Sequence, residues 1–186
     1  DQGWVKEQAS ALSAPKSIPA VSTSASAASA PNAAMWVYET DQLLESASAR
    51  TELFQFCTAR KIVDLFLQAH YESKTKDGPF QIRDAVKMKA FLKEASGKGL
   101  RVHALSGDPS HVLSANHEKV LARVDALAAF NKSTSASSRF AGIHFDIEPH
   151  AMPEWKTSSD EEKCKLLTQF VEVNAKAVEK LRKLSP

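Results

Sequence analysis

The sequence predicts an α/β fold made of four consecutive βα units with parallel strands. Short apolar runs typical of strands begin at Met35, Ile62, Arg101 and Phe140, so successive starts are 27, 39 and 39 residues apart. Segments with helical periodicity lie between these runs, and a parallel crossover needs a connection of this length. We therefore expect residues 34–186 to form four strands in sequential order, with helices on one side of the sheet.

Each expected element is bounded by its own periodicity. Strands should alternate apolar and polar residues, whereas helices should repeat apolar residues every three to four positions. On this basis the strands cover Met35–Glu39, Ile62–His70, Arg101–Ser106 and Phe140–Glu148, and the helices cover about 41–60, 80–96, 115–131 and 160–184. The residues expected on the helix faces are Leu53, Phe56, Cys57 and Arg60; Met88, Phe91, Leu92 and Ala95; Val120, Val124 and Leu127; and Leu167, Phe170, Val171, Asn174 or Ala175, Val178 and Leu181.

Four βα units are the N-terminal half of a TIM (β/α)8 barrel, a fold that needs about 250 residues. The expected units already use residues 34–186. The chain is therefore expected to be either half of a longer barrel or an open four-stranded sheet. A half barrel leaves the first and fourth strands as unpaired apolar edges, and we expect the remaining half of the barrel, or another chain, to cover them.

Composition excludes several classes of partner. The chain has 24 basic and 22 acidic residues, a formal charge of +2, which offers no electrostatic argument for nucleic acid or for a membrane surface. Hydrophobic residues make up 43% of the chain, enough for one core. Cys57 and Cys164 form no Cys-x-x-Cys pair, so we expect two buried thiols and no zinc site. Phosphate-binding and dinucleotide-binding glycine patterns are also missing, and no cofactor is expected.

Residues 1–33 have a different composition from the rest of the chain. They contain the run Pro19-Ala-Val-Ser-Thr-Ser-Ala-Ser-Ala-Ala-Ser-Ala-Pro31, with almost no charge and few large apolar groups. Such a segment cannot offset its ordering entropy by burial, so we expect a linker or an N-terminal extension. Linkers of this kind are common between modules of secreted proteins, which favours an extracellular or periplasmic location.

The segment Phe-Ala-Gly-Ile-His-Phe-Asp-Ile-Glu-Pro-His at 140–150 carries the chemistry. A strand period of two puts Ile143, Phe145 and Ile147 on one face and His144, Asp146 and Glu148 on the other. Ionisable groups in a row must meet water, a ligand or each other. The two carboxylates are about 7 Å apart at a rise of about 3.3 Å per residue, so each can influence the protonation of the other. This spacing is typical of acid–base chemistry.

Further candidates lie at the carboxyl ends of the expected strands, where parallel α/β folds place their chemistry. The candidates beside Asp146 and Glu148 are Tyr38, Glu39, Gln68, His70, Asp108 and His150, with His144 one layer deeper. Trp155, and also Trp36, could stack on the apolar face of a sugar ring. After the strand, Pro149 ends the ladder, and Ser159-x-x-Glu162 predicts a capping box for the last helix.

The motif at 140–148 is similar to the Asp-x-x-Asp-x-Asp-x-Glu signature of family 18 glycoside hydrolases, the chitinases and endo-N-acetylglucosaminidases, which are (β/α)8 barrels. The last two signature positions match as Asp146 and Glu148, and the first two hold Ala141 and His144. The resemblance implies that Glu148 donates a proton to the glycosidic oxygen and that Asp146 steadies the reacting group. It also implies a carbohydrate substrate whose acetamido group replaces the enzyme nucleophile.

Two other functions fit the same residues. The face made of His144, Asp146 and Glu148 consists of ligand types, which leaves open a metal-dependent hydrolase. The signature positions that lack Asp favour a carbohydrate-binding or assembly barrel that has lost catalysis.

Overall fold

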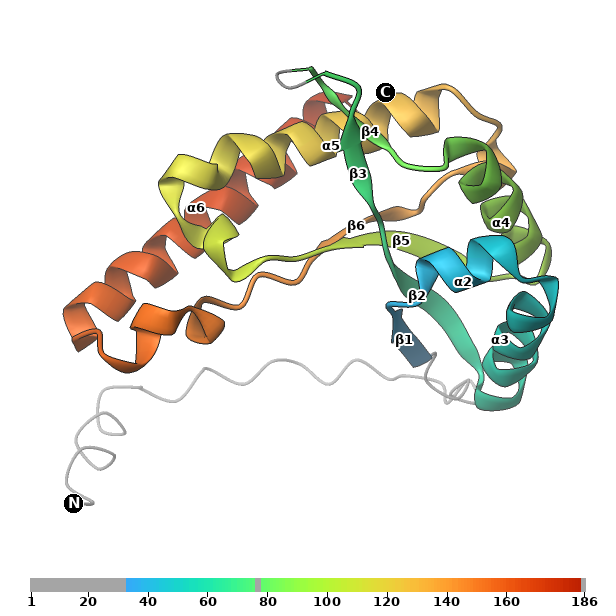
Figure 1. The fold of residues 1–186 in the computed structure, drawn as a ribbon, viewed down its shortest axis with the longest axis horizontal. Coiled ribbons are helices and arrows are strands. Elements are labelled where there is room, and N and C mark those ends of the chain that lie inside the picture. The colour runs from blue at the N-terminus through green and yellow to red at the C-terminus, as the bar shows by residue number, and fades with distance from the viewer. Residues whose placement is uncertain (1–32, 76–77, 185–186) are drawn as a thin grey trace, which may run out of the picture. The chain divides into compact units, whose positions relative to one another are not determined.

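Four parallel strands form the central sheet of the computed structural model, which describes residues 33–75 and 78–184. The strands are β1 (Ala33–Val37), β2 (Ile62–Gln68), β5 (Arg101–Ser106) and β6 (Gly142–Phe145), and they lie in the order β1-β2-β5-β6 (Figure 1). All three pairings are parallel. The predicted α/β class and sequential strand order are therefore confirmed. The expected low-complexity segment 1–33 lies outside the described residues, apart from Ala33.

In the described part of the chain, five α-helices connect and cover the strands. They are α2 (Thr40–Glu45), α3 (Ala47–Arg60), α4 (Ala85–Gly97), α5 (His117–Lys132) and α6 (Asp160–Leu184). The bounds of α6 are those predicted, and the capping box is present: Ser159 N donates to Glu162 Oε2 at 2.7 Å and Glu162 N donates to Ser159 Oγ at 3.3 Å. Across the described residues, no helix is long and apolar enough to cross a membrane.

The single helix expected over 41–60 is in fact two helices. Ser46 is extended, with φ −111° and ψ 114°, and its side chain accepts a hydrogen bond from Ala49 N. A serine that caps in this way ends α2 and begins α3. Periodicity did not reveal the break, because it compares side-chain polarity and not backbone angles.

A small antiparallel hairpin stands where a helix was predicted from Phe80. Its strands β3 (Tyr71–Ser73) and β4 (Phe80–Ile82) form a separate two-stranded sheet. Helix α4 begins only after Asp84, a residue with φ +52°. Strands of three residues are too short to show a period of two against helical periodicity, which explains the wrong start.

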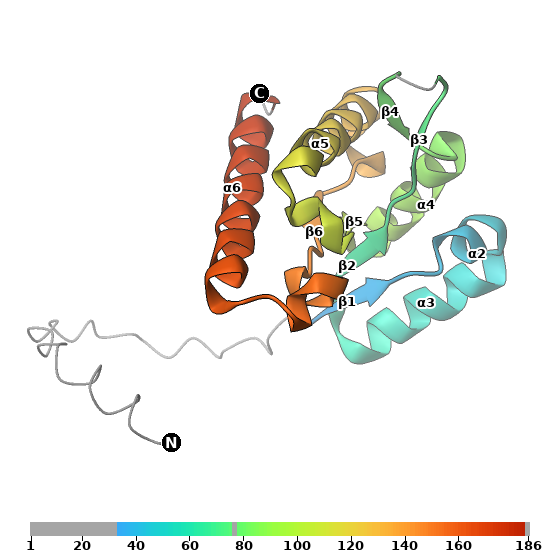
Figure 2. The ribbon, with the colours of Figure 1, turned by 60° about the vertical axis from the view of Figure 1, so that its left-hand side comes forward.

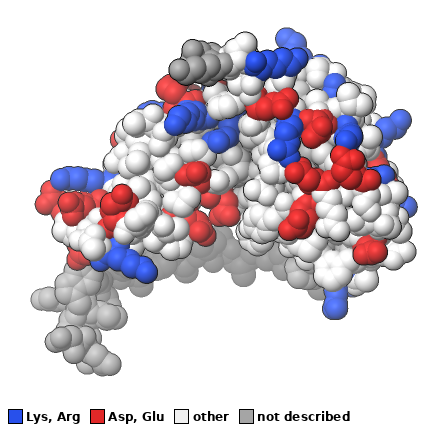
Figure 3. Space-filling view, viewed as in Figure 1, with Lys and Arg blue, Asp and Glu red and all other residues white. Residues whose placement is uncertain are grey.

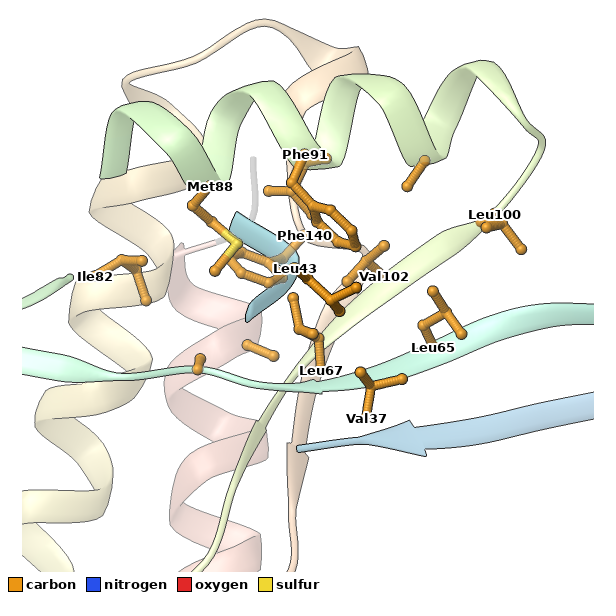
Figure 4. Packing of buried hydrophobic residues seen from close by; sticks show 14 of the residues in the cluster. Val37, Leu43, Leu65, Leu67, Ile82, Met88, Phe91, Leu100, Val102 and Phe140 are labelled. Atoms are coloured by element: carbon orange, nitrogen blue, oxygen red, sulfur yellow. The ribbon is translucent and has the colours of Figure 1, made fainter. Parts of the chain in front are cut away.

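The core lies between one face of the central sheet and the helices. Leu65 and Leu67 of β2 are fully buried, and Figure 4 shows them among Met88, Phe91 and other core residues. The predicted stripes of α4 (Met88, Phe91, Leu92 and Ala95) and α5 (Val120, Val124 and Leu127) are all buried, which confirms them. A second cluster of Val112, Val120, Ile147 and Val173 holds α6 against α5 and the chain after β6.

Three predictions of burial are wrong. Helix α6 buries Val173 and Ala177, while Leu167, Val171 and Val178 are exposed. On α3, Phe54 and Cys57 are buried and Phe56 is exposed. Cys164 is exposed, in contrast to buried Cys57, whose thiol pKa is raised by burial. The exposed apolar residues are on α3 and α6, where the described chain leaves about half of each side chain open to solvent.

Strand β6 is also shorter than predicted. The expected strand ran to Glu148, but β6 ends at Phe145, and short 3-10 turns follow at Pro149–Ala151 and Pro153–Lys156. Ile143, Phe145 and Ile147 still pack on the helix side, as the alternation predicted. Figure 3 shows acidic and basic side chains interspersed on the visible face, in keeping with the small net charge.

Candidate functional site

One face of the central sheet carries no helix among the described residues. Strand register places Trp36, Phe66 and His103 in one row across β1, β2 and β5. His144 of β6 lies over the ring of Phe66 with 4.4 Å between centroids, and Trp36 lies 5.4 Å from the same ring. The face opposite the core is therefore a wall of aromatic and histidine side chains.

A cleft of about 210 Å³ opens where this wall meets the carboxyl ends of the strands. Its lining residues come from all four βα units: Tyr38, Gln68, Leu105, Gly107, Asp108, Pro109, Asp146 and Glu148. The structure thus brings together five of the residues singled out in the sequence, which are Tyr38, Gln68, Asp108, Asp146 and Glu148. Parallel strands in sequential order explain this grouping, because their carboxyl ends meet at one edge of the sheet.

Gly107 allows the last two strands to approach each other at the cleft. A Cβ atom on Gly107 would lie 2.2 Å from the backbone oxygen of Asp146. Asp146 N donates to Ser106 O at 3.0 Å, which continues the β5–β6 ladder past the end of the strand. The close approach therefore fixes the backbone that carries Asp146. Sequence reasoning missed Gly107 as a site residue, and its position directly after a strand was the available signal.

The carboxylates at the cleft differ in their bonding. Asp108 Oδ1 accepts from Ser110 N at 2.8 Å and from Ser110 Oγ at 2.6 Å, and these hydrogen bonds lower the pKa of Asp108. Asp108 is thus an anionic cap for the turn that follows. Within the described chain, the carboxylates of Asp146 and Glu148 hydrogen bond to no other side chain. These two groups are free to bind a ligand.

The other candidates point elsewhere. His144 lies one layer below the cleft, on Phe66. Glu39 precedes α2 as an exposed residue. His70 lies near Asp41, with 3.7 Å between Nε2 and Oδ1. His150 is exposed in the turn after Glu148, and Trp155 stacks with Lys163, whose ammonium nitrogen is 5.9 Å from the ring centroid.

A charged network on the open face was also missed. Arg101 donates to both oxygens of Asp64, at 2.7 Å from Nε and 2.5 Å from Nη2, and His103 Nε2 lies 3.0 Å from Asp64 Oδ1. The hydrogen bond from Arg101 and, after it, the one from His103 lower the pKa of Asp64 to about 2. These residues lie towards the amino ends of β2 and β5, so they form part of the wall and not of the cleft.

A second missed cluster is buried beside Asp108. Arg123 Nη1 lies 2.5 Å from His111 Nε2, and its guanidinium stacks over the ring of Tyr71 at 5.6 Å. Burial and the neighbouring Arg123 charge lower the pKa of His111 to about 4. A neutral imidazole can accept the hydrogen bond from Arg123. The sequence offered no signal for this cluster, because its members come from a hairpin, a turn and a helix.

Within the ranges 33–75 and 78–184, no group of three or more His, Cys, Asp or Glu side chains could hold a metal ion. Asp146 and Glu148 share the cleft, whereas His144 belongs to the aromatic wall. No family model, curated protein or solved structure matches the chain. The residues of the cleft are therefore the basis on which a function can be proposed.

Proposed function

We propose that the chain hydrolyses a glycosidic bond in the cleft at the carboxyl ends of β1, β2, β5 and β6, and that its fold is half of a TIM (β/α)8 barrel. Glu148 is the general acid and Asp146 the supporting carboxylate. The observation that carries this proposal is that both carboxylates line one cleft and, among the described residues, hydrogen bond to no other side chain. An extracellular or periplasmic location accords with a glycan substrate.

We assign separate tasks to the residues of the cleft. Glu148 is exposed and can reach a glycosidic oxygen, so its proton passes to that oxygen as the bond to the leaving sugar breaks. Asp146 is half-buried and anchored through its backbone to Ser106, so its charge stays beside the positive centre that develops on the sugar. The acetamido oxygen of an amino sugar then supplies the nucleophile, and water completes the hydrolysis.

Tyr38 and Gln68 supply the means to hold a sugar. Tyr38 is exposed at the end of β1, where its ring offers an apolar surface and its hydroxyl a hydrogen bond. The Gln68 side chain can donate to and accept from sugar hydroxyls. Asp108 contributes a fixed negative charge at the rim, because its hydrogen bonds to Ser110 keep it ionised.

The test compares Glu148→Gln with wild type on a panel of amino-sugar and neutral oligosaccharides, measured by release of reducing ends. Glutamine keeps the shape but has no transferable proton, so turnover should fall by about 10²–10⁴-fold while binding persists. Glu154→Gln is the matched control, since Glu154 is exposed and lies outside the cleft. Full activity in Glu148→Gln would refute the assignment.

A non-catalytic carbohydrate-binding protein is the second candidate. The exposed rings of Trp36 and Tyr38 on the open face favour it, because half-exposed aromatic rings are the surfaces on which sugars stack. Under this function the wild-type protein would bind oligosaccharides without releasing reducing ends, and Tyr38→Ala would weaken retention. A metal-dependent hydrolase would instead lose all activity when a chelator is added.

A further inference from the structure

Both outer edges of the central sheet are unpaired in the described residues. Within 33–75 and 78–184, β1 pairs only with β2, and β6 pairs only with β5. Each edge presents backbone N–H and C=O groups that a further strand can use. All four strands are parallel, so a fifth strand that extends the same pattern would also run parallel to its neighbour.

Helix α6, which follows β6 in the chain, carries an exposed apolar stripe. Its buried side faces α5, whereas Leu167, Val171 and Val178 are 46%, 65% and 45% exposed. These residues, with Cys164 and Ala175, recur at helical spacing along one side. We call Leu167, Val171 and Val178 the α6 stripe. Monomeric proteins rarely leave such a stripe exposed to water, which indicates a contact surface.

Helix α3 carries an apolar side chain near the opposite edge. Phe56 is 47% exposed. On α3 the residues Thr51, Gln55 and Thr58 line the groove shared with Glu94 of α4 and with Lys98, which follows α4. Helical geometry places Phe56 on the other side of α3, away from α4. Figures 1 and 2 both show α3 and α6 at opposite ends of the row of helices.

The exposed apolar side chains supply more than half of the area that a stable interface needs. Trp36 and Tyr38 on the open face are 49% and 54% exposed. An aromatic side chain has roughly 150–250 Å² of surface, so these two, Phe56 and the α6 stripe together expose on the order of 500 Å². A stable complex buries about 800 Å² per partner. Strand edges and polar neighbours can supply the remainder.

We propose that a second copy of this chain completes the sheet, with β6 and α6 of each copy docked against β1 and α3 of the other. A twofold axis through the centre of the ring makes this contact twice, so neither edge remains open. The result is a closed ring of eight parallel strands. This assembly does not depend on glycan hydrolysis.

A second copy offers each edge of the sheet a parallel strand and an exposed apolar helix surface. Each helix of a parallel βα arrangement packs between its own strand and the next one. Helix α6 therefore lies over the junction of β6 and the second copy's β1, and its stripe meets the second copy's α3, where Phe56 is exposed. The aromatic wall, with Trp36 at its edge, becomes the interior of the ring, and the two clefts open at the same end.

The test is the mass of the full chain in solution, measured by sedimentation velocity and light scattering over a range of concentrations. A dimer has twice the mass of the 20.3 kDa chain. Val171→Lys and Phe56→Glu each place a charge in the contact, and each should raise the dissociation constant at least tenfold. Val86→Lys is the control, since Val86 is 83% exposed on α4, away from both edges.

Mixing the two variants sharpens the test. In a mixed dimer one contact brings the lysine introduced by Val171→Lys against the glutamate introduced by Phe56→Glu. The other contact is wild type, so mixing should restore the dimer. Circular dichroism confirms that each variant is folded. A monomer up to about 100 µM, open polymers, equal weakening by Val86→Lys, or failure of mixing to restore the dimer would each overturn the proposal.

Discussion

Replacing Gly107 with alanine tests whether the close approach at the cleft holds the fold together. The added Cβ would lie 2.2 Å from the backbone oxygen of Asp146 and 3.0 Å from its carbonyl carbon. Relaxed contacts between heavy atoms are about 3.5 Å, so the two segments must separate by roughly 1 Å. The neighbour is backbone and cannot rotate away.

We expect Gly107→Ala to cost about 3 kcal/mol, the upper part of the range for overpacked sites. For a chain of this size that lowers the thermal midpoint by roughly 6–12 °C. Scanning calorimetry measures this fall in the thermal midpoint. Hydrogen exchange of the Asp146 amide, which donates to Ser106 O, should also become faster. Gly97→Ala is the matched control, because apart from its chain neighbours and the backbone of its own helix no atom lies within 4 Å of the added Cβ. Equal midpoints for Gly107→Ala and wild type would refute the argument.

Two further predictions concern the core and the acid response. Leu65→Ala should cost about 2–5 kcal/mol, since Leu65 is fully buried in the main core and its truncation leaves a cavity. The exposed Val86→Ala should change the free energy of unfolding, measured in urea, by less than about 0.5 kcal/mol. The folded state should also lose stability as the pH falls from about 6.5 to 4. Burial holds the pKa of His111 near 4, below the value of about 6.5 for an unfolded chain, so the unfolded state binds the extra proton in that window. His111→Gln keeps an acceptor for Arg123 and should flatten the stability profile there; an unchanged slope between pH 4 and 6.5 would contradict it.

The sheet could be predicted because its strands obey simple rules. Arg101–Ser106 was predicted with its observed bounds, since alternation and the turn at Gly107 both mark it. Buried stripes on α4 and α5 followed from helical periodicity. The hairpin β3–β4 could not be predicted in this way, because three-residue strands depend on tertiary contacts with α5 and not on their own pattern.

The site was predictable only as far as the strands reach. Sequential parallel order placed Tyr38, Gln68 and Asp146 at one edge of the sheet, and the cleft contains them. Beyond each strand the direction of the chain depends on local turns. His70 therefore turns towards Asp41, and His150 stays in solvent. Alternation gives the side of a strand on which a residue lies but does not describe the loop after it.

The error on α6 has a physical explanation that bears on the proposed assembly. Apolar residues occur on more than one side of this helix, so periodicity alone cannot choose between the face of Val173 and the face of Val171. In one copy, contacts with α5 and the second cluster select Val173 and leave Val171 in water. Selection on a sequence acts on the assembled protein, so an apolar stripe without a partner in one chain indicates a partner outside it. If the second copy covers α6, the face of Val173 and the face of Val171 are both buried. The apolar pattern of α6, which does not fit the burial seen in one chain, then fits the burial in the dimer.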